Sequence, residues 1–218
     1  MRLRYETFSA VLDTVYLALM TNLLLAVACL PPIAVFLTTD PGRSWPLLAL
    51  LAPSAGPALC AVFAVLAAYT DGRSTAVIAT FARAWRATWR RATAMTAIAT
   101  ALIVVLGVDI AAFWGRPAGA VAIPVLAVAV VLAGATTLLT LVLLVERPGV
   151  RLRDAARACA YLAIRRWYLT GLSLAVLALL QTLLVSRPAL ALGLAAAPLL
   201  YVVWANSRYT FTATKGPS

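Results

Sequence analysis

Long apolar segments alternate with short polar segments along this chain of 218 residues. The apolar segments predict six helical spans, which cover about 15–38, 45–70, 92–114, 118–145, 167–186 and 189–205. All but the last reach the roughly 20 residues that a helix needs to cross ~30 Å of hydrocarbon, and the last lies at the short end of the usual range. The pattern therefore predicts an all-α, polytopic integral membrane protein, with one membrane domain over residues 1–218.

The basic residues lie almost entirely in alternate polar segments. Of the 18 Lys and Arg residues, two precede the first span, five lie in 71–91, six in 146–166 and two after the last span. Only Arg43, Arg116 and Arg187 lie in the other connections. Because short cytoplasmic loops are enriched in Lys and Arg, we predict a multi-pass plasma-membrane protein with both termini in the cytoplasm.

Composition supports a membrane location and argues against an enzyme. Hydrophobic residues make up 64% of the chain, and the mean hydropathy is +0.97. The net charge of +11 is best explained by attraction to the anionic cytoplasmic leaflet, so we expect no nucleic-acid partner. The chain has no histidine, which excludes His-ligated metals and imidazole-based catalytic triads. We expect a non-enzymatic protein without a cofactor.

Each of the two basic loops is predicted to contain an amphipathic helix. In the first loop an apolar face and an arginine face alternate with the helical period, which is typical of a helix lying at the membrane interface. The apolar face consists of Ile78, Phe81, Trp85 and Trp89, and the other face of Arg83, Arg86 and Arg90.

The helix of the second loop has a stripe of small residues, formed by Ala156, Cys159, Ala160 and Ala163. Small side chains allow close helix contact, so this helix is expected to pack on protein. It is the candidate surface for docking a partner. The candidate docking residues are Asp154, Arg157, Ala160, Ala163, Arg165 and Arg166.

The two basic loops also suggest a parallel internal repeat. With an offset of 75 residues, Asp71 aligns with Glu146, and Arg90-Arg91 aligns with Arg165-Arg166. The positive-inside rule alone could produce the same pattern, so independent convergence stays open beside duplication.

Polar and helix-breaking residues inside the spans are further candidates. Pro53, Gly56 and Pro57 predict a kinked or locally unwound second span. Asp109 is an intramembrane carboxylate close enough to the outer end of its span to pair with Arg116, and we interpret it as structural. Asn22 and Gln181 are expected to form interhelical hydrogen bonds.

Asp154-Ala155-Ala156 resembles the Glu-Ala-Ala loop through which ABC importer permeases engage their ATPase. Ala160 stands where that loop has a glycine, and the downstream Ile-x-Leu-Pro is absent. An acidic residue at a helix start produces the same three residues, and we adopt that interpretation.

Several segments together resemble the YesL-like family of small bacterial membrane proteins. They are Asn22 with Leu23-Leu24-Leu25, Leu30-Pro31, Gly56-Pro57-Ala58, Phe81 with Trp85, Leu152-Arg153-Asp154-Ala155, Arg165 to Leu169, and Ala197 to Tyr209. The resemblance implies a bacterial cell membrane and a domain of unknown function whose members tend to be encoded beside carbohydrate ABC importers. Leu30-Pro31 and Gly56-Pro57 are more widely separated here than in shorter members.

Two functions follow as hypotheses. The first is an accessory or partner component of a carbohydrate ABC uptake system, in contact with its permease or ATPase. The second is a small secondary transporter or permease, indicated by the candidate repeat, the broken second span and Asp109.

Overall fold

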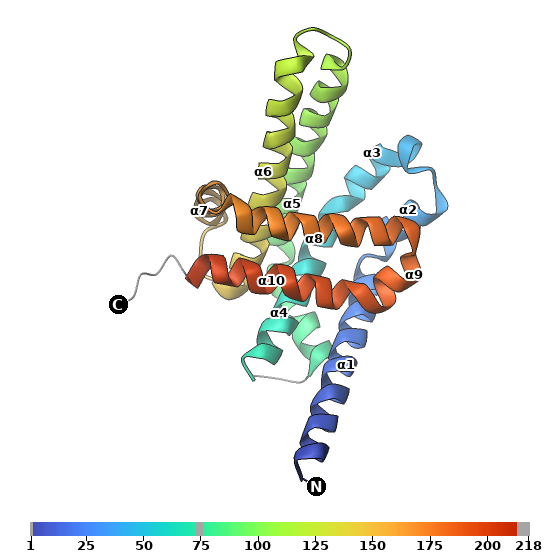
Figure 1. Cartoon of the computed structure of the whole chain (residues 1–218), viewed down its shortest axis with the longest axis vertical. Coiled ribbons are helices and arrows are strands. Elements are labelled where there is room, and N and C mark those ends of the chain that lie inside the picture. The colour runs from blue at the N-terminus through green and yellow to red at the C-terminus, as the bar shows by residue number, and fades with distance from the viewer. Residues whose placement is uncertain (1, 73–75, 213–218) are drawn as a thin grey trace.

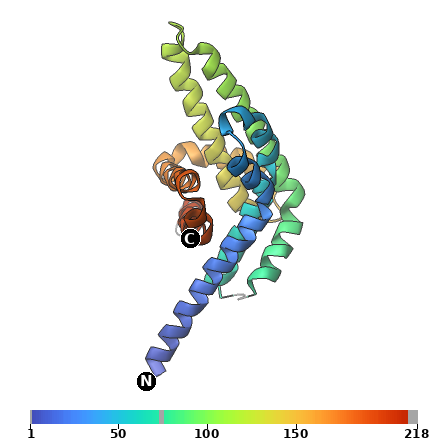
Figure 2. The same ribbon diagram turned by 90° about the vertical axis from the view of Figure 1, so that its right-hand side faces the viewer.

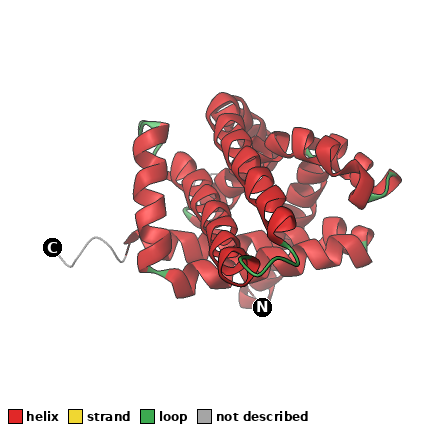
Figure 3. Ribbon diagram, turned by 90° about the horizontal axis from the view of Figure 1, so that it is seen from above, coloured by secondary structure: helices red, strands yellow, loops and turns green. Residues whose placement is uncertain are grey.

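The computed structural model describes residues 2–72 and 76–212, and all regular structure in them is helical (Figure 3). In chain order the elements are α1 (Arg2–Ala28), α2 (Leu30–Thr38), α3 (Pro41–Leu51), the 3-10 helix η1 (Ala52–Ser54), α4 (Ala55–Thr70), α5 (Val77–Phe113), α6 (Gly119–Glu146), α7 (Leu152–Arg165), α8 (Trp167–Ser186), α9 (Pro188–Leu190), the π-helix η2 (Ala191–Ala195) and α10 (Ala196–Thr212). Arg73 and Lys215, two of the basic residues used to orient the chain, lie outside the described residues.

The helices match the predicted spans closely. Among the described residues, five helical stretches are long and apolar enough to cross a membrane, and a sixth forms if Leu12–Ala28 and Leu30–Thr38 are taken together. The prediction of an all-α, polytopic membrane protein is therefore confirmed.

The first candidate span is sharply bent. Leu12–Ala28 and Leu30–Thr38 meet at an angle of 74° beside Cys29. Pro31 and Pro32 follow directly and have no N–H groups to donate to the carbonyls of Val27 and Ala28. The missing hydrogen bonds explain why the helix changes direction here.

The first basic loop is helical, as predicted, but its helix is continuous with the third span. Residues 77–113 form a single helix of 37 residues, because no proline interrupts them and Gly107 is their only glycine. At 1.5 Å per residue α5 is about 55 Å long, well beyond the ~30 Å hydrocarbon layer. Because arginines are costly in hydrocarbon, we expect the arginine-rich first half of α5 to extend beyond it.

The core of the molecule forms around α4, which packs against α1, α5, α6 and α10. Cys60, Ala61, Val62 and Phe63 of α4 are fully buried. A second, smaller core joins α6 to α7. These two clusters position the pocket and the α7 surface described below.

The long α5–α6 hairpin is crossed by the pair α8 and α10, which run side by side across its axis (Figures 1 and 2). Spanning helices usually tilt by no more than about 40° from the membrane normal. Length and apolarity predict that a helix can span, but they do not predict this packing direction. The arrangement consequently differs from an aligned six-helix bundle.

The two segments of the candidate repeat also differ in structure. Helix α5 continues without a break through Arg90 and Arg91, whereas α7 ends at Arg165 and α8 begins at Trp167. Arg166, at φ −121° and ψ 46°, forms the break.

Candidate functional site

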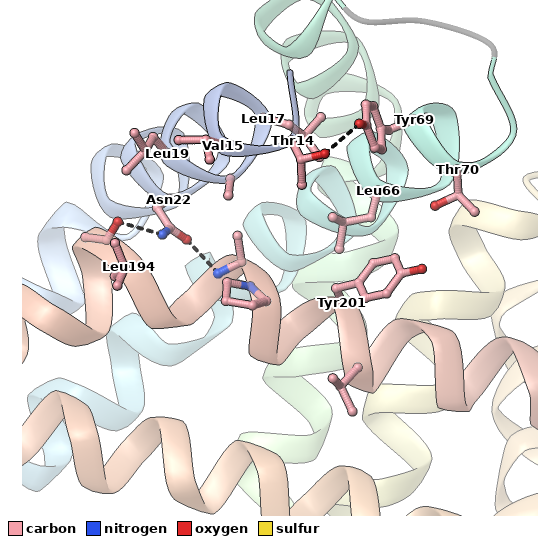
Figure 4. Close-up of a pocket in the computed structure, with 15 residues that line it drawn as sticks. Thr14, Val15, Leu17, Leu19, Asn22, Leu66, Tyr69, Thr70, Leu194 and Tyr201 are labelled. Carbon is pink, nitrogen blue, oxygen red and sulfur yellow. Dashed lines mark hydrogen bonds between the residues drawn. The ribbon is translucent and has the colours of Figure 1, made fainter. Parts of the chain in front are cut away.

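A pocket of about 930 Å³ lies between α1, α4 and the segment that joins η2 to α10. Figure 4 shows side chains from all three converging on it. The lining residues are Thr14, Val15, Leu17, Ala18, Leu19, Asn22, Leu66, Tyr69, Thr70, Gly193, Leu194, Ala197, Pro198, Tyr201 and Val202. None of them is charged, and most are apolar.

Asn22 ties α1 to the π-helix at the edge of this pocket. Its Nδ2 donates to the Gly193 carbonyl at 2.9 Å, and its Oδ1 accepts from the Ala197 N–H at 2.6 Å (Figure 4). An α-helix would join these two backbone groups directly, because they are four residues apart. The buried amide takes the place of that bond and thereby stabilises the local π-helix.

The hydroxyl groups of the pocket lie away from Asn22. Thr14 Oγ1 and Tyr69 Oη are 3.0 Å apart, and Thr70 and Tyr201 line the same end (Figure 4). Thr14 and Thr70 are the residues at the predicted cytoplasmic ends of the first two spans. The pocket thus changes along its length from a hydroxyl-rich end to an apolar interior.

An ion-pair junction follows directly after Thr70. Arg208 Nη1 lies 2.9 Å from Asp71 Oδ1, and Arg208 Nε lies 3.7 Å from Glu146 Oε1. The guanidinium carbon is also 5.1 Å from the centre of the Trp204 ring. This junction connects the ends of α4 and α6 to α10, and it joins the two acidic residues that the candidate repeat had aligned.

The predicted break in the second span is present as η1 and the start of α4. Pro57 has no N–H for the Pro53 carbonyl, and Thr96 Oγ1 of α5 lies 3.0 Å from that oxygen. Gly56 permits this approach, because a Cβ there would lie 2.6 Å from Thr96 Oγ1 and 2.9 Å from the Ala92 carbonyl. The three candidate residues therefore form a close contact between α4 and α5.

The small-residue face of α7 is occupied by α6 of the same chain. Its buried residues are Ala155, Cys159 and Ala163, which pack on Ala135, Leu139 and Leu143. Cys159 and Ala163 of the predicted stripe are buried in this contact, whereas Ala156 and Ala160 are only half-buried at its edges. Ala163 is not accessible to a partner.

The opposite face of α7 is open. Asp154, Arg157 and Arg165 are exposed, and Arg166 is half-buried at the break before α8. Tyr161 and Ile164 are 62% and 61% exposed. Burial raises the pKa of the Cys159 thiol on the inner face to about 11, although a hydrogen bond with Thr140 partly lowers it.

The other intramembrane polar candidates lie outside the pocket. Asp109 is half-buried near the end of α5 and, among the described residues, makes no ion pair with the exposed Arg116. Gln181 lies on the exposed surface of α8 rather than in a helix interface. Within 2–72 and 76–212, no three Cys, Asp or Glu side chains are grouped so that they could hold a metal ion.

Sequence reasoning missed the pocket and the Arg208 junction. The only available signal for the junction was Arg208, an arginine that follows the sixth predicted span and lies close to Tyr201, Trp204 and Tyr209 in the sequence. The pocket depends on the approach of α1 to α10, which are separated by about 180 residues and have no shared sequence pattern.

Residues 17–110 match the model of a family described as "Protein of unknown function, DUF624". No curated protein and no solved structure matches the chain. The matched segment runs from α1 through most of α5 and includes Asn22, the α4 break and Asp71, whereas α7 and Arg208 lie beyond it. Over residues 17–110 this polytopic membrane protein is therefore similar to DUF624, a family of unknown function.

Proposed function

We propose that this protein is a non-enzymatic accessory component of a carbohydrate ABC uptake system and binds the importer's permease or ATPase through the outer face of α7. The observation that carries the proposal is the exposed set of Arg157, Tyr161, Ile164 and Arg165 on a helix whose opposite face is fixed to α6. The kind of partner follows from the resemblance to YesL-like proteins, because these tend to be encoded beside such importers.

The composition of this face suits protein recognition. Residues 157, 161, 164 and 165 follow the helical spacing and share one side of α7. Tyrosine and arginine are enriched in protein interfaces, where they supply much of the binding free energy. Anchoring of α7 on α6 reduces the entropy that binding would otherwise cost. Two arginines further favour an acidic partner surface.

The experiment is affinity purification in mild detergent, followed by mass spectrometry of the proteins recovered. The wild type should recover a permease or ATPase, and the double variant Arg157→Glu/Tyr161→Ala should lose at least about tenfold of it, which corresponds to about 1.4 kcal/mol. Arg86→Glu is the matched control, because Arg86 is an exposed arginine on α5 with the same predicted cytoplasmic side. Equal recovery with both variants, or recovery of neither importer component with the wild type, would refute the proposal.

A small secondary transporter or permease is the second candidate. Three helix discontinuities favour it: the bend beside Cys29, the break at η1 and the π-helix η2. Transporters commonly bind substrate at such interruptions. Under this candidate Asp109→Asn would abolish solute uptake at normal expression, whereas the accessory role leaves Asp109 structural.

A further inference from the structure

The pocket between α1, α4 and α10 opens toward the surroundings of the molecule through an apolar rim. Val15 and Leu19 of α1 are each 49% exposed, and Leu194 and Val202 on the opposite wall are 68% and 43% exposed. Leu194 and Val202 belong to a helical stretch that is long and apolar enough to cross a membrane, and Val15 and Leu19 belong to a bent helix pair that is long and apolar enough only as a whole. With these helices in the bilayer, we expect the rim to face lipid hydrocarbon.

The interior of the pocket is poorly suited to water. An enclosed water molecule needs about two to four polar partners. Asn22 already uses one of its two amide N–H groups on Gly193 and its carbonyl oxygen on Ala197, and the remaining deep lining residues, such as Leu17 and Leu66, are apolar. A carbohydrate would be equally poorly matched, because its hydroxyls would lose their hydrogen bonds to water there.

The lining of the pocket is rich in hydroxyl groups at one end and apolar at the other. Thr14, Tyr69 and Thr70 lie at one end of the pocket, whereas Leu19 and Leu194 lie toward Asn22 (Figure 4). Thr70 directly precedes Asp71, which pairs with Arg208. The lining therefore changes in polarity along its length in the same way as a membrane lipid does between its polar glycerol region and its acyl chain.

We propose that this pocket binds one membrane phospholipid, with an acyl chain along Leu17, Leu66 and Leu194 and the ester region at the hydroxyls of Thr14, Tyr69 and Tyr201. The lipid fills a space of about 930 Å³ and bridges α1 to α10. This site does not include the α7 surface, so the lipid-binding proposal does not depend on whether a partner binds α7.

The test uses the full chain in mild detergent, to which phosphatidylglycerol with a photoactivatable diazirine in its acyl chain is added in increasing amounts. After illumination, labelled peptides are mapped by mass spectrometry. The proposal predicts that labelling of peptides around residues 14–22, 66–70 and 193–202 saturates as the amount of probe rises. Labelling of the exposed surface of α8 should rise in proportion to the probe.

Two variants fill the pocket from different sides. Ala18→Phe occupies its wall, and Val202→Trp occupies its exposed rim without disturbing the buried core. Each should reduce labelling of the pocket peptides about tenfold, a difference of about 1.4 kcal/mol in binding. The control is Ala178→Phe at an exposed position of α8 outside the pocket, which should leave the labelling unchanged. Non-saturable labelling, or equal labelling in Val202→Trp and the control, would overturn the proposal.

Discussion

Thr96 shows how one side chain accommodates a broken helix inside a membrane protein. Pro57 leaves the Pro53 carbonyl without its helical donor, and the Thr96 hydroxyl of the neighbouring helix lies within hydrogen-bond distance of it. The same hydroxyl lies 2.8 Å from the Ala92 carbonyl, which already accepts a helical N–H. The Ala55 N–H also reaches the Pro53 oxygen, so the Thr96 hydroxyl is a second donor that takes the place of the missing N–H of Pro57.

We predict that Thr96→Val lowers the free energy of unfolding in detergent by about 0.5–1.5 kcal/mol, because it removes the hydrogen bond that replaces the missing N–H of Pro57. Thr93→Val is the matched control, since the Thr93 hydroxyl is buried and has no hydrogen-bond partner. Its loss should be neutral or stabilising. Chemical unfolding of both variants measures the difference, and equal stability of the two would show that the hydroxyl does not support the break.

At the scale of single elements, the sequence predicted the existence of helices better than their contacts. The six spans, the break between Pro53 and Pro57 and the helix that begins near Asp154 could be predicted, because apolar length, missing N–H groups and helical period act locally. On α7 the predicted stripe included Ala156, whereas the residue buried against α6 is Ala155, since a stripe of alanines defines no single contact direction.

Long-range contacts could not be predicted for a different reason. Asp71 and Arg208 are separated by 137 residues, and their meeting depends on where α10 lies relative to α4. Hydrophobicity specifies that these helices leave water, but in lipid it does not select which helices pack together. The pocket at Asn22 depends on the same packing.

The α6–α7 contact gives a prediction for a whole element. Ala163 is 3% exposed against α6, so Ala163→Phe should overpack this contact and destabilise α7 by about 1–3 kcal/mol. Ala158 is exposed on the same helix, and Ala158→Phe should have almost no effect. Limited proteolysis of the segment after Glu146 compares the two variants. Equal cleavage rates would contradict close packing of α7 on α6.

At the scale of the whole molecule, the proposed function requires each connection to lie on a particular side of the membrane. The uneven distribution of arginines predicts that the α6–α7 turn is cytoplasmic and that the turns before α3 and after α8 are outside. The α8–α10 pair is the most informative part, because it lies across α5 and α6 (Figure 1). An α7 surface that binds an importer component must also be cytoplasmic.

The most direct test is labelling of single cysteines with a membrane-impermeant thiol reagent in intact cells. The background is a chain in which Cys29, Cys60 and Cys159, all buried, are replaced by alanine. Cysteines at Gly42 and Ser186 should react from outside, and a cysteine at Gly149 should react only after the cells are permeabilised. Labelling at Gly149 in intact cells would place α7 outside and contradict the account, and protection of Ser186 would show that α8 and α10 do not cross the bilayer.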